Sequence, residues 1–357
     1  MFHTRWLKWL AVGCTFWAAS ASARADALND TFDIFWELHW HQSGNLYWLR
    51  RWATPPEKTL YYSVNAGASA SNRSRAVEAL GTVLEVIGWK AEEVPEGDKR
   101  VQMEFTIRRF TDDQMRQYAC FVQPQSNNGL MTKAKIELSE QWTYGCVLHE
   151  MMHAMGISGH PRGSTVLSYF RGNGQKLTDI DRFLLRTWYS NDIRAGMSPL
   201  QAARALNQSW IRETLAPDAQ AAAVAQEQKW FDNNLRSLEA FAAGQGEPPV
   251  VLYRSGSIND AGIRAGKAQV QALLGWSYLT GSTLQPDSEK AAGYLLSAGK
   301  LGHFGATSVL MRYLNDGSLK TKAHKDVCEW ARGVPKGEQG GNSKAYDDLL
   351  ASKECAP

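Results

Sequence analysis

The stretch VLHEMMHAMG at residues 147–156 decides how the rest of the chain is interpreted. His149 and His153 are four residues apart, a spacing that places both imidazoles on one face of a helix, where they can bind one cation. Glu150 follows the first histidine, and a carboxylate there can accept a proton from a zinc-activated water. Gly156 predicts the end of the helix, because glycine adopts the left-handed conformation at little cost. We therefore expect a helix that carries a Zn2+ site, with Glu150 as the general base.

The loop after this helix contains the expected third ligand, His160, which lies just past the glycine turn. Three histidines leave one coordination position of zinc for water, whereas structural zinc sites more often close all four positions with cysteines. Asp179 and Asp181 are acidic alternatives, but a helix is expected to begin at these residues. We therefore expect His149, His153 and His160 to hold the metal.

This stretch resembles the metzincin clan of zinc peptidases, whose pattern is HExxHxxGxxH followed by a turn built around methionine. Four residues match that pattern position by position: His149, Glu150, His153 and Gly156. The third histidine is displaced by one, because Gly159 stands where the clan has histidine. The resemblance implies that Gly159 is looped out and that His160 enters the space of the clan's third ligand.

Two later stretches extend the resemblance, which covers Thr59 to Tyr189. STVLSY at residues 164–169 resembles the methionine turn, with Leu167 in place of methionine. Tyr169 falls on a tyrosine that contacts zinc or the oxyanion in two branches of the clan. LTDIDRFLLRTWY at residues 177–189 resembles the closing helix of the clan. The resemblance thus implies a metzincin-like α+β fold, Zn2+ as cofactor, and a catalytic role for Tyr169 beside Glu150.

The residues before the motif predict a small mixed sheet with one long helix. A β-type run at 59–64 is followed by apolar residues at helical spacing over 72–90. Residues 101–108 alternate between apolar and polar, which is typical of a half-buried strand. Two shorter β-type runs follow at 118–122 and 134–138.

Residues 1–25 are typical of an export signal, with a basic start, an apolar stretch over 9–19 and small residues before a cleavage site after Ala25. The apolar run is shorter than the roughly 20 residues that span a bilayer, which disfavours a membrane anchor. A lipoprotein anchor at Cys14 is a further alternative. We expect an exported protein, periplasmic or secreted, with no integral membrane segment in the mature chain.

The charge of the mature chain excludes two classes of partner. The signal contains three basic residues and no acidic ones, so its removal lowers the formal net charge from +3 to 0. No nucleic-acid or anionic-membrane partner is therefore implied.

Four cysteines remain after Cys14 is removed, which is typical of disulfide bonding in an oxidising compartment. Of the three possible connectivities, one bridge per domain favours Cys120 with Cys146 and Cys328 with Cys355. Free buried thiols are the alternative.

The C-terminal part is expected to be helical, and a ten-residue stretch at 272–281 is echoed at 308–317. This echo resembles the Sel-like branch of tetratricopeptide repeats, in which helix pairs stack into a short solenoid. A plain helical bundle is the alternative. If the repeats are present, they are a candidate surface for a protein partner.

We therefore divide the chain into a signal at 1–25, a metzincin-like zinc peptidase domain at 26–198, a helical linker at 199–250 and a helical repeat domain at 251–357. The expected function is zinc-dependent hydrolysis of peptide bonds in a protein or peptide substrate. The alternative is a zinc-binding but inactive zincin-like domain that acts as a scaffold through the repeats. The aromatic segment from Asp26 to Trp52 has no clear helix or strand pattern, and its relation to the cleft stays open.

Overall fold

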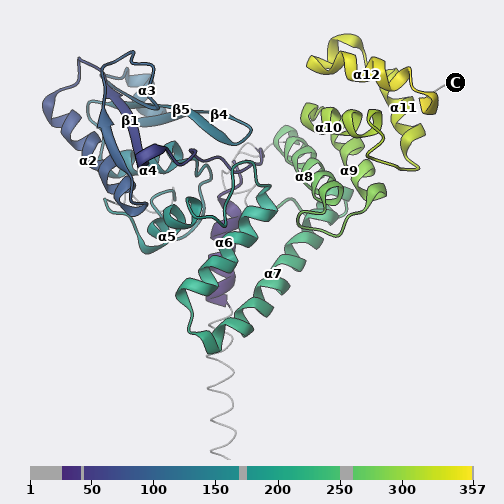
Figure 1. The fold of residues 1–357 in the computed structure, drawn as a ribbon, viewed down its shortest axis with the longest axis horizontal. Helices are drawn as coiled ribbons and strands as arrows, with labels where there is room; N and C mark the ends of the chain where they lie inside the picture. The colour runs from purple at the N-terminus through teal and green to yellow at the C-terminus, as the bar shows by residue number, and fades with distance from the viewer. Residues whose placement is uncertain (1–25, 42–43, 169–174, 250–259, 356–357) are drawn as a thin grey trace, which may run out of the picture. The chain divides into compact units, whose positions relative to one another are not determined.

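The structure is a computed structural model that describes residues 26–41, 44–168, 175–249 and 260–355 (Figure 1). The chain forms two compact units. The described residues of the first unit are 26–38, 50–195 and 202–233. The second unit contains the described parts of 39–49, 196–201 and 234–357.

The first unit is built around a five-stranded mixed sheet with the order β2-β1-β3-β5-β4. Its strands are β1 (Thr59–Val64), β2 (Lys90–Glu93), β3 (Met103–Arg108), β4 (Cys120–Asn127) and β5 (Leu130–Ser139). The first three and β5 are parallel, whereas β4 runs antiparallel to β5 at one edge. The small mixed sheet predicted from the sequence is therefore confirmed.

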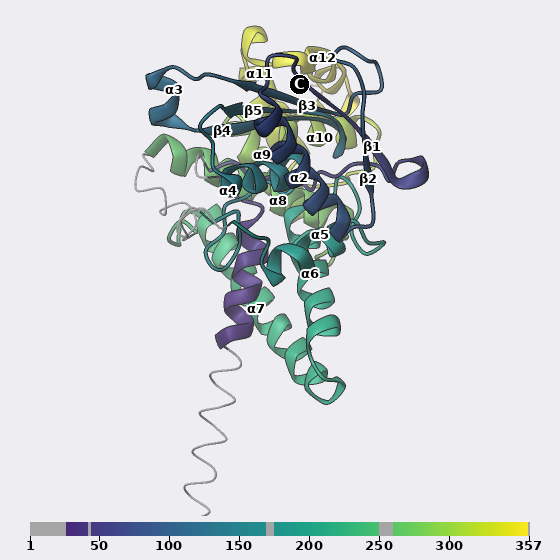
Figure 2. The same ribbon diagram turned by 90° about the vertical axis from the view of Figure 1, so that its left-hand side faces the viewer.

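The helices that complete this part of the first unit are α2 (Ala70–Val86), α3 (Asp112–Gln117), α4 (Tyr144–Ala154) and α5 (Asp179–Trp188). The turn η1 (Pro56–Lys58) precedes β1. Two perpendicular views place α2, α4 and α5 on the same side of the sheet (Figures 1 and 2). The helix α4, which carries the histidines, packs against α2 and against β4 and β5.

The strands with clear alternation were predicted best. Met103, Phe105 and Ile107 of β3 are buried, and the polar residues between them are half-buried. The strand β2 was missed because all four of its residues are exposed, which leaves no apolar alternation. The hairpin of β4 and β5 is longer than predicted, because polar residues continue both strands to a tight turn with positive φ at Asn128 and Gly129.

Residues 26–37 form a helix, which the sequence pattern did not predict. Ile34, Phe35 and Trp36 are consecutive and all buried, so its apolar residues do not lie on a single stripe. A helix that is apolar on several sides lacks the amphipathic period on which the prediction depended.

The first unit also includes part of the segment that was expected to be a linker. The helices α6 (Pro199–Thr214) and α7 (Pro217–Ala243) span this segment. Trp210 of α6 packs edge-on against Phe35 and Phe183, with ring centroids 5.9 Å and 4.9 Å apart. Trp230 of α7 packs against Phe32 at 5.7 Å. Residues 202–233 are therefore part of the core of the first unit, unlike the linker expected over 199–250.

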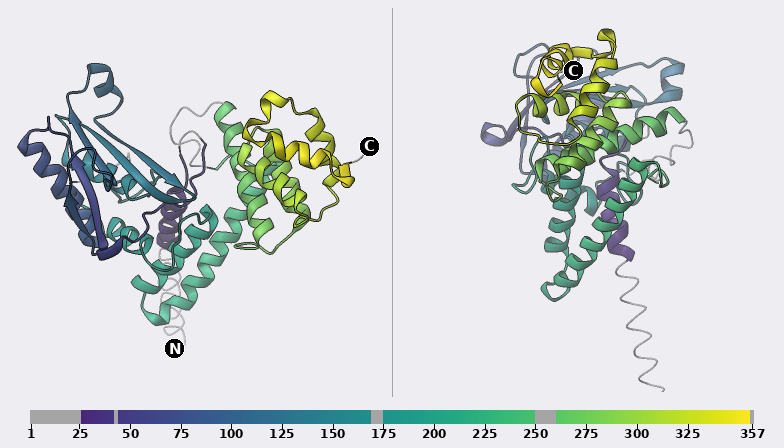
Figure 3. Two further views of the ribbon diagram at one scale, coloured as in Figure 1. Left: turned by 45° about the horizontal axis from the view of Figure 1, so that its top comes forward. Right: turned by 90° about the vertical axis from the view of Figure 1, so that its right-hand side faces the viewer.

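The C-terminal region is helical, as the sequence predicted (Figure 3). Its helices are α8 (Asp260–Thr280), α9 (Ser288–Lys300), α10 (Phe304–Asn315), α11 (His324–Gly333) and α12 (Ser343–Leu350). Short 3-10 turns follow as η3 (Lys336–Glu338), η4 (Gly340–Asn342) and η5 (Lys353–Cys355). The two echoed stretches fall on α8 and α10, each of which packs against α9. Their likeness to Sel-like repeats stays a prediction.

Two disulfides connect the cysteines in the preferred pairing. Cys120 is bonded to Cys146 with their Cα atoms 6.2 Å apart, and Cys328 to Cys355 with theirs 5.4 Å apart. Among the described residues, none of the helices combines the length and apolar character that crossing a bilayer requires. The predicted signal at 1–25 lies outside the described residues.

Candidate metal centre

The helix α4 places two histidines side by side. The Thr143 side chain caps its first turn by accepting from the Cys146 backbone N–H at 3.3 Å. The imidazole rings of His149 and His153 have centroids 4.7 Å apart, as the four-residue spacing predicts. The chain turns away at Gly156, where φ is +93°. The local sequence thus creates both the shared face and the turn behind it.

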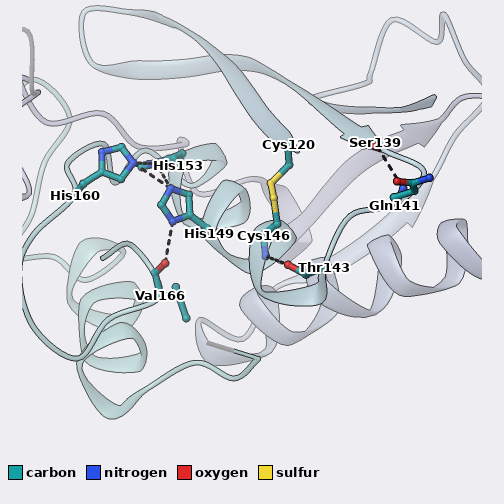
Figure 4. The surroundings of a disulfide bond; sticks show 9 residues. All are labelled: Cys120, Ser139, Gln141, Thr143, Cys146, His149, His153, His160 and Val166. Carbon is teal, nitrogen blue, oxygen red and sulfur yellow. Dashed lines mark hydrogen bonds between the residues drawn. A yellow bond between two sulfur atoms is a disulfide. The ribbon is translucent and has the colours of Figure 1, made fainter. Parts of the chain in front are cut away.

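The loop after this turn brings His160 to the same point (Figure 4). Its Nε2 atom lies 3.0 Å from the Nε2 atoms of both His149 and His153, which are themselves 3.1 Å apart. The three side chains are all half-buried. The one-residue displacement of His160 therefore does not keep its imidazole away from the other two.

Backbone carbonyls determine which nitrogen of each helical histidine carries the proton. His149 Nδ1 lies 2.9 Å from the Val166 carbonyl oxygen, and His153 Nδ1 lies 2.6 Å from the Ile157 carbonyl oxygen. A carbonyl only accepts, so Nδ1 donates in both cases and Nε2 of the neutral ring is an acceptor. Two acceptor nitrogens lie 3.1 Å apart here, an arrangement that a shared cation would stabilise.

The geometry of the donors fits zinc. Nitrogens bound to one tetrahedral zinc at about 2.0–2.1 Å lie about 3.3 Å apart, close to the separations of 3.0–3.1 Å found here. Burial lowers the pKa of His149 despite the opposing hydrogen bond to Val166, so the ring stays in the neutral form that metal binding requires. Three imidazoles, two of them with Nδ1–H bonded to a backbone carbonyl, are a typical ligand set for zinc.

The carbonyl that orients His149 is itself held by the first turn of α5. The Val166 N–H donates to Asp181 Oδ2 at 3.1 Å, and the Asp181 carboxylate is fully buried. Asp181 also accepts from the Thr178 N–H at 2.8 Å, as part of the capping box of α5. As the sequence predicted, this aspartate belongs to the start of a helix. It holds the Val166 backbone, and Val166 in turn orients His149.

Glu150 lies against the edge strand of the sheet. Its side chain is 7% exposed, and burial raises its pKa to about 8, although the Val122 N–H of β4 donates to it and lowers the value. A cation held by the neighbouring histidines favours the charged carboxylate, because opposite charges stabilise each other. The Cys120–Cys146 disulfide joins β4 to α4 (Figure 4).

Tyr169, the predicted second catalytic residue, lies outside the described residues. Leu167, two positions earlier in the turn that resembles the methionine turn, is fully buried. Its apolar side chain is therefore in an environment that suits either leucine or methionine.

Sequence reasoning missed one charged residue beside this centre. Glu37 is 4% exposed, and its Oε2 accepts from the Arg162 backbone N–H at 2.7 Å, two residues after His160. The available signal was a single acidic residue within the apolar run IFWELHW at 34–40, since a charge in such a run is buried only with a partner.

A second group of potential ligands lies in the C-terminal helices, at His324, Cys328 and Cys355. Both of its cysteines are bonded to each other, so they offer no thiolate to a metal. The three-histidine cluster is therefore the stronger candidate among the described residues.

Comparison with curated proteins gave no match. A family model described as "Protein of unknown function (DUF2927)" matches residues 25–208, which include all three histidines, Glu150 and the whole sheet. The match spans more than half of the chain, and the chain therefore belongs to the DUF2927 family.

Proposed function

We propose that this chain is an exported zinc-dependent peptidase with a metzincin-like catalytic domain. The observation that carries the proposal is the convergence of three imidazole Nε2 atoms within 3.1 Å, in a tautomer that makes Nε2 of the two helical histidines an acceptor. His149, His153 and His160 would hold the ion. When bound, zinc supplies a Lewis acid that polarises a carbonyl and lowers the pKa of a coordinated water.

Glu150 is the group placed to move protons in this reaction. As a general base it accepts a proton from the attacking water, and as a general acid it passes that proton to the leaving amine. Its position directly after His149 on α4 is that of the general base in the HExxH pattern, where the glutamate is not a ligand. Tyr169 is proposed to assist the oxyanion from the resemblance alone.

The sheet offers a place for an extended substrate. Among the described strands, β4 is at the edge of the sheet and has β5 as its one neighbour. An extended peptide can add to such an edge through main-chain hydrogen bonds, which suits a protein or peptide substrate. The contact of Val122 with Glu150 puts this edge next to the proposed base.

A zinc protein without turnover is the second candidate, with the C-terminal helices as a scaffold for a protein partner. The observation that favours it is the low exposure of Glu150, 7%, which limits access to the carboxylate. Both candidates require zinc, and they differ in hydrolysis.

The deciding experiment measures zinc content and hydrolysis of a peptide library by the wild type, Glu150→Gln and a control, Glu78→Gln. Glu78 is an exposed glutamate on α2. We expect stoichiometric zinc in all three and a loss of at least roughly 10²- to 10⁴-fold in kcat/KM for Glu150→Gln alone. Undiminished hydrolysis by Glu150→Gln would refute the peptidase mechanism. Stoichiometric zinc without hydrolysis by any of the three proteins would favour the scaffold.

A further inference from the structure

The C-terminal end of the helix over residues 26–37 contacts the loop that carries His160, both before and after that histidine. Before it, the Gly159 backbone packs so closely on Glu37 and Leu38 that a Cβ at this position would overlap their backbone atoms. After it, the Arg162 N–H donates to the Glu37 carboxylate at 2.7 Å. The loop segment 159–162 is therefore held at two points by the same turn of helix.

The carboxylate contact is the stronger of the two in energetic terms. Glu37 is 4% exposed, and a buried carboxylate is stable only when hydrogen bonds compensate for its lost hydration. A short bond from a backbone N–H to a charged oxygen is among the strongest protein hydrogen bonds. The guanidinium of Arg162 lies 3.4 Å from Glu37 Oε1, but its side chain is 54% exposed, so this ion pair contributes little.

Pro161 connects the Arg162 amide, which is bonded to Glu37, to His160 through a rigid stretch of backbone. Its ring fixes its own φ near −65° and also restricts the backbone of the preceding residue, which is His160. Pro161 is also buried, so the dipeptide has little freedom between Gly159 and Arg162. A displacement of the Arg162 amide would therefore move the His160 imidazole and leave the ligands on α4 in place.

We propose that Glu37 is a positioning residue that holds His160 in the metal site through the Arg162 backbone amide. The inference rests on the proposed zinc site. It gives part of the aromatic N-terminal segment a role in supporting the third ligand.

The first test compares zinc dissociation constants of full-length variants by competition with a chromophoric chelator. We expect Glu37→Ala to weaken zinc binding roughly 10- to 100-fold, the range for groups that orient a metal ligand. Glu37→Gln keeps an oxygen that can accept from the Arg162 N–H, so we expect a change within about threefold. The matched control is Asp33→Ala, one turn earlier on the same helix, whose carboxylate accepts from Trp230 Nε1 at 2.8 Å. We expect this control to keep wild-type zinc affinity.

A double variant separates positioning from general loss of stability. If Glu37 acts through His160, then adding Glu37→Ala to His160→Ala causes no further loss of zinc affinity. A further tenfold loss in the double variant would show that Glu37 acts on the fold as a whole and would overturn the proposal.

Hydrogen exchange of the metal-free protein tests the contact without zinc. The Arg162 amide should exchange faster in Glu37→Ala than in the wild type and should be unchanged in Asp33→Ala. Wild-type zinc affinity and wild-type exchange in Glu37→Ala would refute the positioning role even if the protein is an active peptidase. If the affinity falls as expected but no variant hydrolyses peptides, the peptidase proposal fails and the positioning role stands.

Discussion

Gly156 illustrates at the residue scale how the end of the histidine helix depends on a glycine. Its φ is +93°, and an added Cβ would overlap the carbonyl of Arg50. Gly302 has a similar φ of +88° but nothing within 4 Å of the position of a Cβ. A substitution at Gly302 therefore introduces backbone strain alone, whereas one at Gly156 introduces both backbone strain and steric overlap.

We expect Gly302→Ala to lower the free energy of unfolding by about 1–2 kcal/mol, the cost of the left-handed conformation for a residue with Cβ. Gly156→Ala should lower it by more than about 3 kcal/mol, because the backbone of Arg50 must also move. Chemical denaturation of both variants measures the difference. Equal losses would contradict the role of the close approach at Gly156.

The burial of His39 predicts how the stability of the protein depends on pH. It is 1% exposed, and burial lowers its pKa to about 4, although donation from Nδ1 to the Tyr47 carbonyl raises the value. The unfolded chain takes up this proton below about pH 6.5, whereas the folded chain does so only near pH 4. The stability conferred by neutral His39 is thus complete above pH 6.5 and falls by about 3 kcal/mol as the pH drops to 4. We expect His39→Gln to reduce the acid slope of the unfolding free energy in this window, and a slope parallel to that of the wild type would contradict the assignment.

At the element scale, the Cys120–Cys146 disulfide ties the edge strand β4 to the histidine helix α4. Its cysteines are separated by 26 positions, and those of the Cys328–Cys355 disulfide by 27, so the two bridges close loops of nearly equal length. Replacing either pair with alanine should lower the free energy of unfolding by about 3–4 kcal/mol, because loop closure restricts the unfolded chain equally.

The two alanine pairs should differ in function. Of the two disulfides, only Cys120–Cys146 orients β4, whose Val122 contacts Glu150. We therefore expect kcat/KM to fall when this disulfide is removed and to stay unchanged when Cys328–Cys355 is removed. Hydrolysis rates under conditions where both variants are folded provide the measurement. An equal effect of both pairs on hydrolysis would show that the link between β4 and α4 has no special role.

At the scale of the whole molecule, the boundary of the first unit decides which truncated chain keeps the candidate metal site intact. A chain that ends at Gly246 retains Trp210 and Trp230, whose rings pack on Phe35 and Phe32. A chain that ends at Ser198 loses both tryptophans and exposes those rings. We expect the longer chain to bind stoichiometric zinc and the shorter one to show a lower Tm, measured by calorimetry. A fully stable, zinc-loaded shorter chain would show that the helices after Ser198 are dispensable to the first unit.

The sequence by itself determined what depends on local periodicity. Four-residue spacing placed His149 and His153 on one face of α4, and two-residue alternation located β3. Both patterns result from the backbone geometry of a single element, so they are readable without any partner.

Only the tertiary structure decided how distant segments support these residues. Glu37 meets Arg162 across 125 positions of sequence, and Asp181 orients Val166 behind His149. The helix over 26–37 and the core role of Trp210 were equally hidden, because a residue that is buried by a remote partner leaves no period in its own neighbourhood. The pairing of His149 and His153 was therefore predictable from local spacing, whereas the contacts that hold the three-histidine cluster in place depend on long-range packing, which local patterns do not encode.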